Sequence, residues 1–110
     1  MVKNKVIEIV KYLSEKLQAN GVEVADIIIF GSQARGDAKR DSDIDLIIIS
    51  DSFKGKNIFE RAEMVGPAKM AAIKKYLVPF DIIMKTKQEY KSGKSIIVGY
   101  AMEDGISVGQ

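Results

Sequence analysis

The sequence predicts an α+β fold in which helices pack against a small mixed β-sheet. Three isoleucine-rich apolar runs are expected to be strands, over residues 24–30, 44–50 and 79–85. Longer segments with apolar residues at helical spacing precede the first run and separate the second from the third. With 110 residues, of which 46% are hydrophobic, the chain is expected to form a single domain over residues 1–110 with one modest core.

The N-terminal segment is expected to be an amphipathic helix that ends at Asn20-Gly21, a common stop signal. Most of its charged residues lie away from one apolar stripe, which is therefore expected to face the sheet. The stripe consists of Val6, Ile9, Val10, Leu13 and Leu17.

The strands at 24–30 and 44–50 are apolar enough to be covered on both faces. Because side chains alternate along a strand, Asp43 and Asp45 are expected to project from the same face. Ile47 and Ile49 are expected to share that face, and Ile44, Leu46 and Ile48 to take the other.

Further helices are expected later in the chain. Residues 57–76 have a helical pattern, with a break near Gly66-Pro67 because proline disrupts a helix interior. After the third strand, Thr86 is expected to cap a short helix through residue 90, and Ser95 a helix over residues 96–103. A terminal stretch, Gly105-Ile106-Ser107-Val108, follows.

The ten residues between Gly31-Ser32 and Asp43-Ile44-Asp45 form a polar loop between two apolar runs. Glycine lets a ligand approach the main chain closely, and Ser32 is expected to be the N-cap of a short helical turn over residues 33–35. Such a turn presents free N–H groups and a partial positive charge to phosphate. Arg35 could reach the same phosphates, so Gly31, Ser32 and Arg35 together predict a phosphate-binding turn.

The aspartates after this loop are candidate metal ligands. Two ionised carboxylates about 4 Å apart repel by roughly 4 kcal/mol at an effective dielectric near 20, so sequences tend to avoid such pairs unless a cation lies between them. All-oxygen ligands favour Mg²⁺ or Mn²⁺ over Zn²⁺. Asp81, at the start of the third apolar run, is a third candidate ligand beside Asp43 and Asp45 and the candidate general base. The alternatives are a solvent-exposed Asp-x-Asp turn and a charge at a strand edge.

The positions of these residues also predict the sheet topology. Gly31-Ser32 lies at the end of the first strand, whereas Asp43 and Asp45 lie at the start of the second, so the two strands must be antiparallel to face one ligand. Asp81 lies at the start of the third strand. The second and third strands are therefore expected to be parallel and joined by a right-handed crossover through the helix at 57–76.

Composition excludes several classes of chemistry. The chain has no cysteine and no histidine, which excludes disulfides, thiol chemistry and histidine-based catalysis. A net charge of +2 is too small to indicate duplex nucleic acid as the main partner. No apolar run reaches membrane-spanning length, and the charged N-terminus is not a signal peptide, so we expect a cytoplasmic protein.

The segment GSQARGDAKRDSDIDLIII with the later Asp81 resembles the nucleotidyltransferase superfamily that includes DNA polymerase beta. More narrowly, it resembles the minimal nucleotidyltransferases of bacteria and archaea, over roughly Ile27 to the end of the chain. The resemblance implies the nucleotidyltransferase fold, with two Mg²⁺ ions on Asp43, Asp45 and Asp81. It also implies that the phosphates of a nucleoside triphosphate, most commonly ATP in this family, lie on Gly31, Ser32 and Arg35. Many such proteins are antitoxins of HEPN-domain partners, and some attach AMP to the partner.

Three functions remain open at this point. The chain is an active nucleotidyltransferase whose acceptor hydroxyl lies on a partner protein, an antitoxin that acts only by covering its partner, or a regulatory nucleotide-binding module. Loop solvation and capping are expected for Asp37, Asp41 and Asp51. Lys39 and Arg40 are expected in a solvated loop, with steering of phosphate as the alternative. Two apolar groups belong either to the core or to a face for a partner or a second copy: Ile96, Ile97, Tyr100 and Met102, and Met64, Met70, Ile73 and Tyr76.

Overall fold

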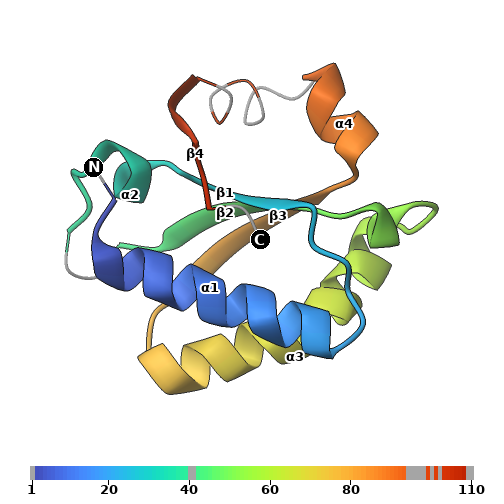
Figure 1. The fold of residues 1–110 in the computed structure, drawn as a ribbon, viewed down its shortest axis with the longest axis horizontal. Helices are drawn as coiled ribbons and strands as arrows, with labels where there is room; N and C mark the ends of the chain where they lie inside the picture. The colour runs from blue at the N-terminus through green and yellow to red at the C-terminus, as the bar shows by residue number, and fades with distance from the viewer. Residues whose placement is uncertain (1, 40–41, 94–98, 100, 102, 109–110) are drawn as a thin grey trace.

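The structure is a computed structural model that describes residues 2–39, 42–93, 99, 101 and 103–108. Its elements follow one another in the order drawn in Figure 1. They are α1 (Asn4–Ala19), β1 (Asp26–Phe30), α2 (Ser32–Arg35), β2 (Ile44–Ile49), the 3-10 helix η1 (Asp51–Phe53), α3 (Ile58–Tyr76), β3 (Phe80–Lys85), α4 (Lys87–Ser92) and β4 (Ile106–Ser107).

The sheet has four strands in the order β3-β2-β1-β4. β1 pairs antiparallel with β2, and β2 pairs parallel with β3, so the predicted mixed topology is confirmed. β4 adds an antiparallel strand at the other side of β1, where Ile106 pairs with Ile29. The sequence did not predict β4 because a strand of two residues shows no periodicity.

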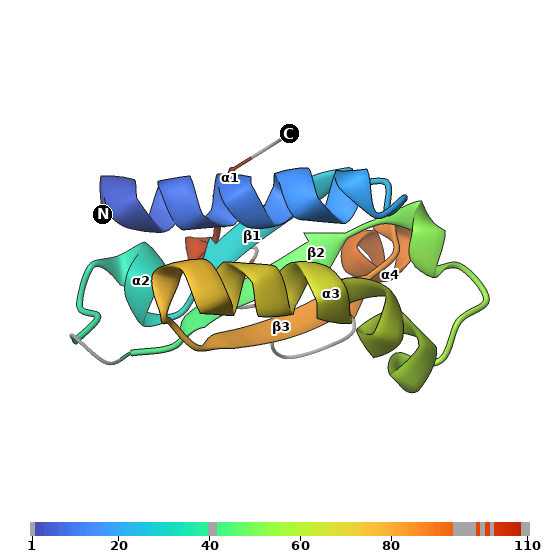
Figure 2. The ribbon, with the colours of Figure 1, turned by 90° about the horizontal axis from the view of Figure 1, so that it is seen from below.

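Helices α1 and α3 lie side by side on one face of the sheet (Figures 1 and 2). The predicted stripe of α1 is buried there, together with the predicted inner residues of β2, Ile44, Leu46 and Ile48. On the opposite face, Ile47 and Ile49 form a smaller cluster with Ile28 and Ala101. The expectation that β1 and β2 are covered on both faces is therefore confirmed.

Helix α3 is continuous from Ile58 to Tyr76 and contains Pro67, so the predicted break at Gly66-Pro67 is wrong. The proline costs one backbone hydrogen bond, and Figure 2 shows the first turns of α3 set at an angle to the rest. The helix continues because its residues on either side of the proline are held against the core. These buried residues are Val65, Ala68 and Ala72.

Two of the other helix ends agree with prediction. α1 ends before Asn20-Gly21, and Thr86 caps α4 in a capping box with Glu89, although α4 extends two residues further than expected, to Ser92. The helix predicted over 96–103 falls largely outside the described residues. Within the part of the chain that the structure describes, no helix is both long and apolar enough to cross a membrane.

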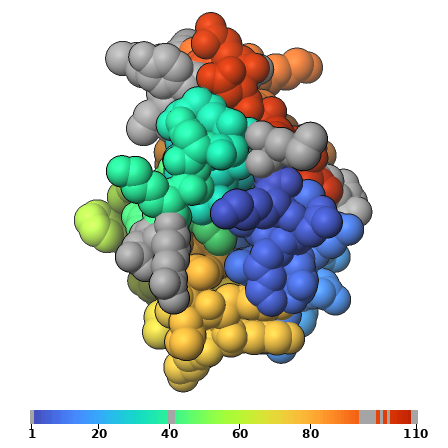
Figure 3. All heavy atoms as spheres, turned by 90° about the vertical axis from the view of Figure 1, so that its left-hand side faces the viewer, coloured from blue at the N-terminus to red at the C-terminus, as the bar shows by residue number. Residues whose placement is uncertain are grey.

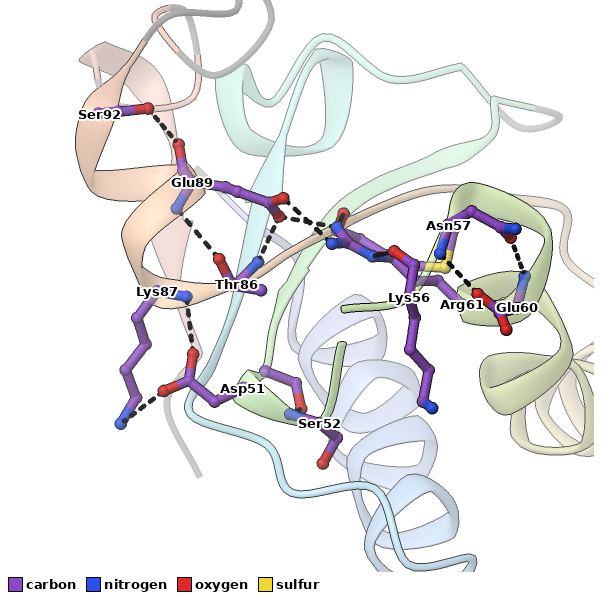
Figure 4. Close-up of polar contacts among 12 residues, drawn as sticks. Asp51, Ser52, Lys56, Asn57, Glu60, Arg61, Thr86, Lys87, Glu89 and Ser92 are labelled. Atoms are coloured by element: carbon purple, nitrogen blue, oxygen red, sulfur yellow. Dashed lines mark hydrogen bonds and ion pairs between the residues drawn. The ribbon is translucent and has the colours of Figure 1, made fainter. Parts of the chain in front are cut away.

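Arg61 joins three elements on the right-hand side of Figure 1, an arrangement that the sequence did not predict. Its guanidinium donates to both carboxylate oxygens of Glu89, at 2.7 and 3.0 Å, and thereby ties α3 to α4 (Figure 4). It also donates to the backbone oxygens of Met84 in β3, at 3.1 Å, and of Lys56, at 2.9 Å. The Arg61 side chain is mostly buried, so this ion pair fixes α4 relative to the sheet.

Candidate functional site

The turn after β1 is formed by Gly31, whose φ of 70° and ψ of −150° favour glycine. Gly31 itself is the N-cap of α2: its carbonyl accepts from the N–H groups of Ala34 and Arg35 at 3.1 and 3.2 Å. The prediction that Ser32 is the N-cap is therefore wrong, because the chain already reverses at the glycine and Ser32 begins the helix. Among the described residues the Ser32 hydroxyl caps no helix, so it is available for another contact.

Gly31 also lies against Asp45. The β1–β2 register pairs Phe30 with Asp45, which brings the next residue, Gly31, beside the Asp45 side chain. A Cβ atom at position 31 would collide with the Asp45 carboxylate oxygen and lie 3.2 Å from its Cγ atom. The absence of a side chain at Gly31 therefore leaves room for the carboxylate as well as permitting the turn.

Asp45 and Asp81 are direct neighbours in the parallel β2–β3 register. Paired residues of adjacent strands project from the same face, which here is the face of Ile47 and Ile49. Asp43 lies two residues before Asp45, immediately ahead of β2, and its projection from the same face stays a prediction. Asp43 and Asp81 are exposed and Asp45 is half-buried, so the three aspartates line an open end of the sheet.

The electrostatics of Asp45 show that these groups act on one another. Burial raises the pKa of Asp45, and repulsion from the carboxylates of Asp81 and then Asp43 raises it further. The guanidinium of Arg35 opposes this rise. The structure thus brings the three predicted acidic residues and Arg35 of α2 into one electrostatic environment.

The three aspartates suit a divalent metal ion by the type of their donor atoms and not by the positions of their side chains. Within the described residues, no three acidic side chains lie close enough together, as placed, to hold a metal ion. The donors are nonetheless all carboxylate oxygens, the kind that Mg²⁺ and Mn²⁺ prefer. A cation beside Asp45 would relieve the repulsion that raises the pKa of this residue.

Arg35 has a partner that the sequence did not predict. Its Nε atom lies 3.2 Å from the Oδ2 atom of Asp37, and both side chains are exposed. Such a pair is weak in water and can exchange for a stronger ligand. The opposite charges two residues apart were the only sequence signal for this contact. A phosphate contact of Arg35 stays a prediction.

The remaining residues that the sequence placed in loops are Lys39, Arg40, Asp41 and Asp51. Lys39 is exposed, as expected, while Arg40 and Asp41 lie outside the described residues. The capping expected of Asp51 is confirmed, because its carboxylate accepts from the backbone N–H of Lys87 at 3.1 Å and so holds the start of α4 (Figure 4).

Figure 3 shows the end of the molecule that carries α2. The α2 region, in teal, lies near the middle of this face, between the start of α1 and the C-terminal part of the chain, with the end of α3 below it. Gly31 and Ser32, at the start of α2, are both half-buried here. The turn is therefore accessible to a ligand from outside the protein.

A family model for the nucleotidyltransferase domain matches residues 6–101 of this chain. The chain belongs to the nucleotidyltransferase domain family. The match spans all three aspartates and the Gly31 turn, and it confirms the resemblance noted in the sequence. No curated protein matches the chain at a significant level.

Solved structures share the fold of this nucleotidyltransferase-family chain. A Sulfolobus solfataricus protein thought to be a nucleotidyltransferase has a TM-score of 0.67 and 24% identity, over 94% of this chain and 78% of that one. A toxin-antitoxin structure with AMP-PNP has a TM-score of 0.65 and 18% identity, over 91% and 73% of the two chains. A protein thought to be a minimal nucleotidyltransferase has a TM-score of 0.59 and 21% identity, over 96% and 95%. At these identities the likeness establishes the fold.

Proposed function

We propose that this chain is a Mg²⁺-dependent nucleotidyltransferase that transfers AMP from ATP to an acceptor hydroxyl. The observation that carries the proposal is the placement of Asp45 beside Asp81, Asp43 and the Gly31 turn at one end of the sheet. These three carboxylates would hold two Mg²⁺ ions, for which Mn²⁺ could substitute. When bound, the ions supply charge neutralisation at the attacked phosphate and the departing pyrophosphate.

The turn would bind the triphosphate. Gly31 leaves the main chain open to a phosphate, and the Ser32 hydroxyl, which caps no helix, can donate to a phosphate oxygen. Arg35 would exchange its exposed partner Asp37 for a second phosphate contact. These contacts would orient the α-phosphorus towards the aspartates, because the turn directly adjoins Asp45.

Asp81 would act as the general base. It is exposed, it lies in register with Asp45, and its carboxylate can accept the proton of an incoming hydroxyl. As the hydroxyl oxygen forms its bond to the α-phosphorus, the bond from the α-phosphorus to the bridging oxygen of the β-phosphate breaks. Pyrophosphate leaves with that bonding pair, and the proton remains on Asp81.

The acceptor hydroxyl is proposed to lie on a partner protein of the HEPN type, with this chain as its antitoxin. Two observations support a macromolecular acceptor: Asp43 and Asp81 are exposed, and a structural neighbour is a toxin-antitoxin assembly with AMP-PNP. The net charge of +2 does not favour nucleic acid as the acceptor. We further propose that this activity takes place in the cytoplasm, where ATP is available.

A second candidate is an antitoxin or regulatory nucleotide-binding module that does not turn over. It is favoured by one observation: within the described residues, the acidic side chains as placed do not converge on a metal position. For an antitoxin that acts only by covering its partner, loss of the carboxylates would leave the biological activity unchanged, whereas a binding module would lose Mg²⁺-dependent ATP binding without any transfer of label having occurred. The two candidates therefore differ in what substitution of Asp43 and Asp45 does.

The test is transfer of label from ATP labelled with ³²P at the α-position, with Mg²⁺, to protein in a lysate of the source cells. The wild type is compared with the Asp43→Asn/Asp45→Asn double variant. The matched control is Glu15→Gln, which removes an exposed carboxylate on α1, across the sheet from the aspartates. We expect the wild type and Glu15→Gln, but not the double variant, to transfer the α-label. No label should be transferred from ATP labelled at the γ-position. Absence of α-label transfer would refute turnover, and absence of Mg²⁺-dependent ATP binding would also refute the binding module.

A further inference from the structure

The outer surface of α3 carries most of the large apolar side chains that the described residues expose. Ile58, Phe59 and Met70 are 67%, 76% and 51% exposed, respectively. They border a groove of about 730 Å³ between α3 and the edge strand β3, to which Ile73 and Ile82 contribute further apolar surface. Figure 2 shows α3 at the surface of the molecule beside β3. An apolar groove of this kind on an otherwise charged surface marks an interaction site.

Gly66, at the middle of α3, supplies a second and independent observation. A Cβ atom placed on Gly66 would meet no atom within 4 Å, so packing inside this chain does not require a glycine there. Glycine in a helix interior lowers helix stability relative to alanine. Counting at 100° per residue, Gly66 lies on the same side of the helix as Phe59, Ala62, Met70 and Ile73. Glycine at the centre of such a stripe allows the backbone of another helix to approach closely.

The charges of α3 indicate what that other helix is. The first half of α3 carries Glu60 and Glu63 besides Arg61, whose charge is paired with Glu89, and the second half carries only cations. These cations are Lys69, Lys74 and Lys75. An antiparallel copy of α3 crossing at Gly66 would lie with its acidic half beside the basic half of the first. Glu63 lies three residues before Gly66 and Lys74 eight residues after it, on the same flank. In the antiparallel pair, Lys74 of one copy therefore lies roughly 7.5 Å along the helix from Glu63 of the other. Among the described residues neither has an ion-pair partner within its own chain, since no salt bridge involves them.

We propose that α3 forms a two-fold symmetric interface between two copies of this chain, crossing antiparallel at Gly66. In this arrangement Phe59 of each copy lies beside Ile73 of the other, because the two positions are equally far from Gly66. The same surface then serves both partners, as two-fold symmetry requires. The interface lies on the face of the sheet opposite to Asp45, so both candidate sites remain open to an acceptor.

The test measures the mass of the full-length protein by sedimentation equilibrium over a range of concentrations. The wild type is expected to be a dimer. Phe59→Asp should give a monomer, and Gly66→Ala should weaken association even though alanine favours the helix. Circular dichroism verifies that each variant is folded. A wild type that stays monomeric at every concentration, or a Gly66→Ala variant that dimerises as well as the wild type, would overturn the proposal.

Charge reversal distinguishes this interface from any other. Glu63→Lys and Lys74→Glu should each weaken the dimer by roughly threefold, because each places like charges on the same flank of the two helices, twice in the symmetric pair. The double variant Glu63→Lys/Lys74→Glu should restore dimerisation, because the pairs are re-formed with their signs exchanged. The matched control Glu15→Lys reverses a charge on α1 and should have no effect. A double variant that dimerises no better than the single variants would refute this pairing, and single variants that dimerise as well as the wild type would show that copies associate elsewhere.

Discussion

Replacement of Asp45 by asparagine is expected to stabilise the protein when metal and nucleotide are absent. Asp45 is half-buried, and its nearest neighbour across the β2–β3 register is another carboxylate, Asp81. Burial and this repulsion raise the pKa of Asp45, so its ionised form is unfavourable in the folded protein. Asparagine has nearly the same shape and no charge, and it therefore removes the unfavourable interaction without opening a cavity.

The magnitude follows from the spacing of the strands. Adjacent strands lie about 4.8 Å apart, and two charges about 5 Å apart repel by roughly 0.8 kcal/mol in water and roughly 3 kcal/mol at an effective dielectric of 20. Because Asp81 is exposed, the lower end of this range applies, and we expect a gain of about 1 kcal/mol at pH 7. For a domain of this size the gain corresponds to a rise in Tm of about 4 °C.

The stability difference between the wild type and Asp45→Asn should depend on pH. The pKa of Asp45 is higher in the folded state than its usual value of 3.8, so the folded state binds the proton more tightly than the unfolded state. Stability is therefore lost as the pH rises from 3.8 through the folded-state pKa, and the variant avoids that loss. Below pH 3.8 the wild type and Asp45→Asn should be equally stable.

The assay is urea denaturation followed by circular dichroism, in EDTA, at pH 7 and near pH 3.5. Glu15→Gln serves as the control, because it removes an exposed carboxylate on α1, on the opposite face of the sheet from the three aspartates. Addition of Mg²⁺ and ATP should then stabilise the wild type but not Asp45→Asn, by an amount that grows with ligand concentration. An Asp45→Asn variant that is less stable than the wild type at pH 7, or whose advantage persists at pH 3.5, would refute the reasoning.

Three further predictions concern single residues. Gly31→Ala should lower the free energy of unfolding by about 2 kcal/mol or more. The loss should exceed that of Gly21→Ala, because both glycines have positive φ but only Gly31 adjoins Asp45. Equal losses in urea denaturation would contradict this contact. The hydrogen bonds from Arg61 lower the pKa of Glu89 from its usual 4.5 to about 2. Glu89→Gln should therefore cost about 1–2 kcal/mol at pH 7 after allowance for screening of this part-exposed side chain. That loss should fade as the pH falls from 4.5 towards 2, and a loss independent of pH would contradict it. Asn57→Ala should remove the capping box of α3 and cost about 1 kcal/mol in thermal denaturation, whereas an unchanged Tm would show that the cap is not needed.

Sequence reasoning succeeded where chemistry constrains geometry. The requirement that Gly31, Asp45 and Asp81 face one ligand was enough to predict both strand directions, and the register places Asp45 beside Asp81. The stripe on α1 was recognised because its period is long and regular. In both cases several residues carry the same signal, so no single position decides the outcome.

Prediction from the sequence failed where one residue or one contact between distant residues decides the structure. At Pro67 the local preference for a break is overcome by packing of Val65 and Ala68 on the core, which no local pattern shows. The Arg61–Glu89 pair joins residues that are 28 positions apart, and neither has a sequence context that identifies the other. Among the described residues no three acidic side chains, as placed, surround a metal position, and the spacing of the aspartates in the sequence did not show this.

The most direct test of the central claim is to locate the site of a bound divalent ion in solution. Mn²⁺ added in small amounts to ¹⁵N-labelled protein broadens the NMR signals of amides near the ion. We expect selective broadening at residues 31–36, 43–46 and 80–82, which is absent in the Asp43→Asn/Asp45→Asn variant. Broadening centred elsewhere, or broadening that the double variant retains, would contradict the assignment of this site.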